Sequence, residues 1–223
     1  MRSGPIDLVT VSREYGAGGS EFAQKLGALL GWPVLDHDIV HRVAERLALD
    51  DAVVERLDEH PPTRLAELAG MLLVTPPESS TAFTPSPLLQ DRVAAAAQAV
   101  IREAAESPPL VVVGHGAQCL FRDRPGTLHI RLIAPLELRV KRLCARLGCS
   151  RTTALNQARR MDEDRDRYVE RHHHRDRRDP LNYDVVFNTG RTPLDDAAAC
   201  AALLVRASRE APVSAAAPAP STA

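Results

Sequence analysis

A glycine-rich stretch, SREYGAGGS at residues 12–20, follows a short apolar run at residues 8–11. Helical spacing of apolar residues begins just after it, with Phe22, Leu26 and Leu29 or Leu30 on one face. Backbone N–H groups in such a turn, together with the positive end of the following helix, can bind an anion. Glycine also lets the backbone approach that anion closely. The stretch therefore predicts a phosphate-binding turn; a tight turn without a ligand is the alternative.

Neither standard glycine motif fits this stretch. The dinucleotide fingerprint G-x-G-x-x-G breaks at its third glycine, where Glu21 stands. The Walker template G-x-x-x-x-G-K-[ST] fits at Gly18 and Ser20. However, Arg13 stands at its first glycine and Gly19 at its lysine. The cation that normally reaches the β- and γ-phosphates is therefore missing from its usual place.

Lysine is scarce in the whole chain of 223 residues. Of its 28 basic residues, only Lys25 and Lys141 are lysines. The first lies more than one turn into the expected helix and the second in a later helix, so neither can replace the missing cation by position. Arg13 is the natural replacement, because a guanidinium is always charged and can grip two phosphate oxygens. Alternatively, Arg13 pairs with Glu14 or Glu21.

Short apolar runs alternate with helical patterns along the chain. We expect strands at 8–11, 33–36, 110–113, 128–133 and 183–187. Helices are expected at 21–30, 37–49, 65–74, 88–106, 135–147, from Ser150 as a cap, and at 193–206. The proline-rich residues 75–87 suit a mobile loop, and the tail from 211 suits disorder. This order implies an α/β fold with a parallel sheet, whose ligands bind beyond the carboxyl ends of the strands.

Composition limits the class of protein. The chain is 44% hydrophobic but only 4% aromatic, so alanine, leucine and valine must fill a single core. A net charge of −1 argues against nucleic-acid or membrane partners. No apolar run approaches the roughly 18 residues of a membrane span, and the start of the chain does not read as a secretory signal. Four cysteines without a C-x-x-C pair favour a cytoplasmic protein. We expect a monomer or homodimer.

Three windows of the sequence resemble the cytidylate kinase-like family, a branch of the P-loop nucleoside monophosphate kinases. They are TVSREYGAGGSEFAQKLGALLGWPVLDHDIVHRVAERL, VVVGHGAQCLFRDRPGTLHIRLIAPLELRVKR and MDEDRDRYVERHHHRDRRDPLNYDVVFNT. The resemblance implies a three-layer α/β/α P-loop NTPase fold with a five-stranded parallel sheet. It implies one domain at 1–207, with an acceptor-binding helical insertion at about 37–107 and an arginine lid at about 150–180, before a disordered tail at 208–223.

The same resemblance implies an activity. The chain would transfer the γ-phosphoryl group of ATP, with Mg²⁺, to a nucleoside monophosphate, with a CMP-like acceptor favoured. One alternative is a nucleotide-binding regulatory protein that has lost transfer. Another is a small-molecule kinase of the dephospho-coenzyme A type. A dinucleotide oxidoreductase is disfavoured, because the third fingerprint glycine is absent.

Resemblance also assigns the donor-side residues. Ser20 occupies the Walker Ser/Thr position, so its hydroxyl would reach Mg²⁺; an N-cap of the helix is its other role. The residues expected to bind the phosphates of ATP are Arg13, Gly16, Ala17, Gly18, Gly19, Ser20 and Glu21.

On the acceptor side, Asp36 and Arg42 fall at substrate-contacting positions. His115 stands where relatives have an arginine on the acceptor phosphate. Histidine is charged only near or below pH ~6.5, so His115 is either a weaker phosphate ligand or the mark of a different acceptor.

A lid pattern, D-x-x-R-x-x-Y, is present as Asp162, Arg165 and Tyr168. We expect Arg160 and Arg165 to stabilise charge on the transferring phosphoryl group, and with Arg13 they form the predicted catalytic set. Most of the other arginines near them suit a solvated helix face.

Overall fold

The computed structural model describes residues 4–36, 38–47 and 87–210. The helix expected at 65–74, nearly all of the proline-rich segment 75–87 and the tail from 211 lie outside the described residues. Most of the expected acceptor-binding insertion falls in the same gap.

Five parallel strands form one sheet in the order β2-β3-β1-β4-β5. This arrangement confirms the predicted five-stranded parallel sheet. The last strand begins two residues later than predicted, because a short 3-10 helix, η1 (Pro180–Asn182), precedes it. The strands are β1 (Leu8–Arg13), β2 (Val34–Leu35), β3 (Leu110–Val113), β4 (Thr127–Ile133) and β5 (Val185–Asn188).

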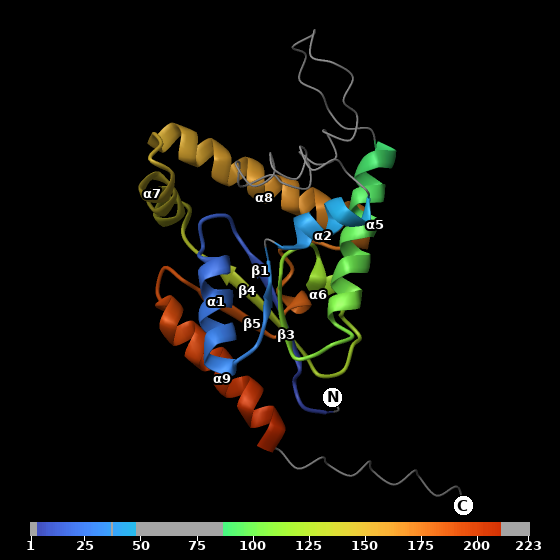
Figure 1. Ribbon diagram of the computed structural model, residues 1–223. Helices are drawn as coiled ribbons and strands as arrows, with labels where there is room; N and C mark the ends of the chain where they lie inside the picture. The colour runs from blue at the N-terminus through green and yellow to red at the C-terminus, as the bar shows by residue number, and fades with distance from the viewer. Residues whose placement is uncertain (1–3, 37, 48–86, 211–223) are drawn as a thin grey trace, which may run out of the picture.

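Helices cover both faces of the sheet, which gives three layers (Figure 1). On one face lie α1 (Gly19–Leu30) and α9 (Leu194–Glu210). On the other lie α2 (Asp38–Arg46), α5 (Pro87–Ala104) and the short α6 (Ala117–Leu120), which the sequence pattern did not predict. No helix of the described ranges is long and apolar enough to cross a membrane.

The alternation of side chains along β1 explains the two cores. Val9 and Val11 face α1 and α9, whereas Leu8 faces α2 and α5. On α1, the row Phe22 and Leu26 is fully buried, and Leu30 continues it. The alternative placement of Leu29 on this face is wrong, since its side chain is 46% exposed.

Two further helices lie at the carboxyl end of the sheet. They are α7 (Leu136–Leu147) and the long α8 (Arg151–His173), and they share a small core that includes Tyr15 of the glycine-rich turn. Ser150 caps α8 as predicted, because its hydroxyl accepts a hydrogen bond from the Thr153 N–H at 3.2 Å. Figure 1 shows α8 crossing above the strands from α7 to α5. The predicted ligand-binding edge of the sheet is therefore bounded by α8.

Candidate active site

The glycine-rich turn joins the end of β1 to the start of α1. Gly18 is the N-cap of α1, in the left-handed region at φ 88° and ψ 25°, where only glycine is free of strain. No side chain caps this helix, so its first N–H groups are open to an anion. Ser20 lies inside the first turn, so the alternative that it is the N-cap is wrong. Its half-buried hydroxyl stands at the start of the helix.

The side chain of Arg13 fills the space beside Gly19. A Cβ atom built on Gly19 would lie 2.5 Å from Arg13 Cγ, and one built on Gly114 would overlap Arg13 Nη1. Two glycines therefore make room for one arginine. The side chain is 18% exposed, and its Nη2 lies 3.8 Å from Asp36 Oδ1. Burial lowers the pKa of Arg13, and the Asp36 charge opposes that effect.

The alternative pairings of Arg13 are not found. The Glu14 carboxylate lies 3.4 Å from Arg139 Nε, and Glu21 lies 3.7 Å from Lys25 Nζ. The carboxylate nearest to Arg13 is instead that of Asp36, which follows β2.

Two of the residues predicted to bind the acceptor are a carboxylate, Asp36, and a neutral imidazole, His115. Asp36 is 6% exposed, and His115 follows β3, the neighbouring strand. Burial, together with the positive charge of Arg13, lowers the pKa of His115 to about 4, so the ring is neutral at pH 7. Its φ of 52° is unusual for a residue with a side chain. Arg42, the third predicted acceptor residue, lies on an exposed face of α2.

Of the two predicted lid arginines, only Arg165 reaches the glycine-rich turn. Its Nη1 donates to the carbonyl of Arg13 at 3.2 Å, and its guanidinium lies 5.5 Å from the ring centroid of Tyr15. Burial and the nearby Arg13 charge lower the pKa of Arg165 to about 9, which leaves it protonated at pH 7. By contrast, the Arg160 side chain is 77% exposed and pairs with Asp164 at 3.9 Å.

Of the other two residues of the lid pattern, Asp162 attaches α8 to the turn and Tyr168 contacts a residue of α8 itself. Asp162 faces the glycine-rich turn and accepts a hydrogen bond from the Tyr15 N–H at 2.8 Å. Tyr168 lies further along the helix, with its ring 4.7 Å from that of His172. There Arg171 makes a two-point contact with Asp91 of α5, at 2.9 and 3.0 Å. The helix is thus attached to its neighbours at its middle and near its C-terminal end.

Two buried arginines at the site were missed from sequence. Arg177, in the coil after α8, donates to the carbonyl of Arg13 at 3.0 Å and to Asp166 at 2.6 Å. It stands in the run RDRR, whose spacing gives no signal. For Arg139 the sequence did hold a signal of burial. This residue lies on the same face of α7 as Leu136 and Leu143, which stand three residues before it and four residues after it.

Thr189, which directly follows β5, supports the turn from another side. The Thr189 hydroxyl donates to the carbonyl of Ala17 at 2.9 Å, and Arg142 donates to the Thr189 hydroxyl at 2.9 Å. Beside it, a Cβ on Gly18 would lie 2.8 Å from Leu194 Cδ1. The turn is thereby fixed on the side away from α8.

Comparison with known proteins agrees with this architecture. The sequence matches the model of the cytidylate kinase-like family over residues 8–191. No protein of the curated set matches it. A crystal structure of an uncharacterized protein from Eubacterium ventriosum is 21% identical, with 89% of this chain and 98% of that chain covered and a TM-score of 0.63.

Two further solved structures share the fold. TT1252 from Thermus thermophilus is 25% identical, covering 91% of this chain and 98% of its own, with a TM-score of 0.50. A gluconokinase from Sinorhizobium meliloti is 18% identical, covering 94% and 96%, with a TM-score of 0.51. Because the family model matches residues 8–191, which is most of the chain, this chain belongs to the cytidylate kinase-like family.

Proposed function

We propose that this chain is an ATP-dependent phosphotransferase in which Arg13 takes the place of the Walker lysine. The observation that carries the proposal is the position of Arg13 across Gly19. A lysine at position 19 and the present arginine could not share that space. The guanidinium would therefore supply the positive charge that the helix start lacks.

The turn fits the triphosphate of ATP. The first N–H groups of α1 are open, and the left-handed Gly18 turns the backbone toward them. Mg²⁺, when bound, would neutralise charge on the β- and γ-phosphates, with the Ser20 hydroxyl as its protein ligand. Within the described ranges no group of three or more His, Cys, Asp and Glu could hold a metal, so phosphate oxygens would supply most of its ligands.

Family membership favours a nucleoside monophosphate of the cytidylate type as the acceptor. Asp36 and His115 would then contact that nucleotide. Its phosphate oxygen would attack the γ-phosphorus while the bond to ADP breaks, and no protein base is needed. Arg165 would stabilise the charge on the group in transfer.

A second acceptor class is favoured by the presence of a carboxylate, Asp36, and a neutral His115 on this side. An acceptor phosphate would bind beside a buried carboxylate whose ion pair with Arg13 spans 3.8 Å, and His115 would add no positive charge. A hydroxyl acceptor would avoid this repulsion. Its oxygen would bond to the γ-phosphorus, ADP would leave, and its proton would pass to Asp36. The gluconokinase from Sinorhizobium meliloti, which shares the fold, is named for such a substrate.

A coupled assay of ADP release tests these assignments. CMP, dCMP, UMP and AMP form one panel of acceptors, and gluconate, shikimate and dephospho-coenzyme A form the other. Acceptor-dependent turnover is expected with one panel, and Arg13→Ala should lower it about 10²- to 10³-fold. ATP binding without turnover on either panel would instead identify a regulatory nucleotide-binding protein. Unchanged ATP affinity and turnover in Arg13→Ala would remove Arg13 from the mechanism.

A further inference from the structure

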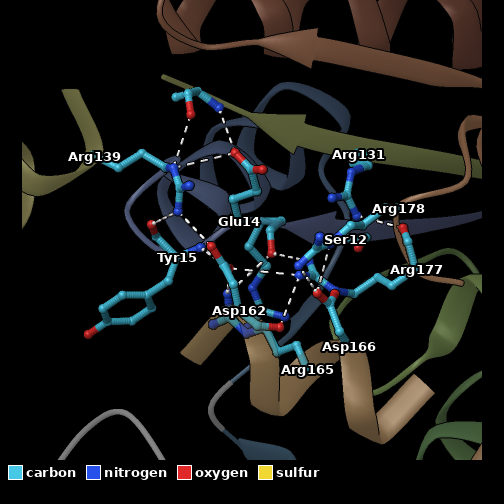
Figure 2. Close-up of polar contacts among 12 residues, drawn as sticks. Ser12, Glu14, Tyr15, Arg131, Arg139, Asp162, Arg165, Asp166, Arg177 and Arg178 are labelled. Atoms are coloured by element: carbon cyan, nitrogen blue, oxygen red, sulfur yellow. Dashed lines mark hydrogen bonds and ion pairs between the residues drawn. The ribbon is translucent and has the colours of Figure 1, made fainter. Parts of the chain in front are cut away.

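Both backbone polar groups of Tyr15 are held by side chains from two helices. The Tyr15 N–H donates to Asp162 Oδ1 of α8 at 2.8 Å, and its carbonyl accepts from Arg139 Nη1 of α7 at 3.1 Å. Figure 2 shows Arg139 and Asp162 converging on this residue. Tyr15 is the second residue after β1, so the clamp acts where the chain enters the phosphate-binding turn.

The two clamping side chains are also joined to each other. Arg139 Nη1 lies 2.6 Å from Asp162 Oδ2, and the exposed fractions of the two side chains are 9% and 14%. Arg139 Nε donates to the carbonyl of Ala134 at 3.0 Å, and the Glu14 carboxylate accepts from the Ala134 N–H at 3.0 Å. Charged hydrogen bonds shielded from water are among the stronger polar contacts in proteins. These contacts close a ring around residues 14 and 15.

The same part of α8 fixes the backbone of Arg13. Its carbonyl accepts hydrogen bonds from Arg165 at 3.2 Å and from Arg177 at 3.0 Å. Arg177 Nη2 in turn donates to the carbonyl of Asp162 at 3.3 Å. The residue whose side chain crosses Gly19 is therefore held through its carbonyl by Arg165 of α8 and by Arg177, which follows that helix.

We propose that Asp162 is a positioning residue that joins the phosphate-binding turn and α8 into one rigid unit. The segment expected to close as a lid is, on this view, a fixed wall that carries Arg165 in place without ATP. Such preorganisation lowers the barrier because donors need not move during the reaction. The effect on catalysis rests on the proposed kinase function, whereas the rigidity does not.

Hydrogen–deuterium exchange of the full chain without ligand tests the rigidity. Asp162→Ala removes the clamp, and Asp162→Asn keeps the shape but loses the charge. Asp164→Asn is the matched control, because Asp164 lies on the same helix and pairs with the exposed Arg160 and Arg167. In Asp162→Ala, exchange in peptides covering 13–20 and 151–168 should rise at least about tenfold, whereas the control should match the wild-type chain.

Kinetics test the consequence for transfer, with whichever acceptor supports turnover. Asp162→Asn should lower kcat by about 10- to 100-fold and change the KM for ATP by less than about threefold. A merely structural role would lower the amount of folded protein and leave the kcat of the folded fraction unchanged.

Three results would overturn the proposal. They are unchanged exchange in Asp162→Ala, protection of 151–168 in the wild-type chain that appears only after ATP is added, and an Asp162→Asn enzyme with normal kcat. If Asp162→Ala does not fold, Asp162→Asn and Arg139→Lys provide the exchange comparison. A wild-type chain that binds no ATP would defeat the proposed function, yet the exchange result would still decide whether the clamp exists.

Discussion

The side chain of Arg13 occupies the space that a side chain at position 19 would need: a Cβ on Gly19 would lie 2.5 Å from Arg13 Cγ. The loss of the lysine at the helix start and the presence of an arginine at the strand end are therefore one structural feature. In this chain the cation beside the helix start comes from β1.

The first prediction exchanges the two positions. Arg13→Gly should weaken ATP binding, and adding Gly19→Lys to that variant should improve its ATP affinity at least about tenfold, since a lysine then reaches the phosphates. Glycine is used at position 13 because a Cβ on residue 19 would lie 2.9 Å from the Cβ of residue 13. Isothermal titration with ATP and Mg²⁺ measures both variants. Gly19→Lys alone should bind ATP more weakly than the wild-type chain, because its Cβ would collide with the Arg13 side chain. The exchange hypothesis fails if lysine gives no recovery in the Arg13→Gly background.

The second prediction concerns Gly114, whose missing side chain leaves room for the Arg13 guanidinium. Gly114→Ala should displace that group and abolish most turnover. Its φ of 81° adds a backbone cost of about 1 kcal/mol. Gly148→Ala is the matched control, because Gly148 has a φ of 62° and open space around it. The midpoint temperature of thermal unfolding should fall similarly in both variants, while the turnover rate should fall only in Gly114→Ala. Equal activities would contradict the assignment.

The third prediction is a pH dependence of stability caused by His115. Its pKa in the fold is about 4, against 6.5 for the free side chain, so the unfolded chain binds more protons between these values. The stabilising effect of the neutral ring is complete above pH 6.5 and is lost as the pH falls toward 4. The loss is on the order of 3 kcal/mol.

Urea unfolding at pH 7.5 and pH 5 measures this dependence. His115→Asn should reduce it, because asparagine does not titrate and tolerates a positive φ. His174→Asn is a control at an exposed residue with φ 53°. If His115→Asn and the wild-type chain lose the same stability between the two pH values, His115 is not the group responsible.

The fourth prediction separates the two lid arginines. Arg165→Ala should lower kcat by about 10²- to 10³-fold, since it removes a buried cation at the turn. Arg160→Ala should change kcat by less than about threefold, because the Arg160 side chain is 77% exposed. Steady-state kinetics on the two variants, which share one helix, decide between them. A comparable loss in Arg160→Ala would show that α8 moves over the triphosphate after all.

Local pattern predicted the sheet well, because parallel strands buried on both faces read as short apolar runs. It also led to Arg13, through the missing lysine. Five residues turn a helix by about 140°, so Arg160 and Arg165 lie on different faces, but the pattern did not say which of the two faces the site. Arg177 lies in coil, where no periodicity exists to read. Its position depends on a tertiary contact, the burial of its guanidinium against Asp166, which local sequence pattern does not reveal.

A single guanidinium, that of Arg13, faces both the phosphate-binding turn and the acceptor side at Asp36. A Walker lysine rising from the helix start would belong to the donor nucleotide alone. On the proposed mechanism donor and acceptor would share this one charge, and each would alter the affinity of the chain for the other by the same factor. An arginine from β1 in place of the lysine would then make donor and acceptor binding a linked equilibrium.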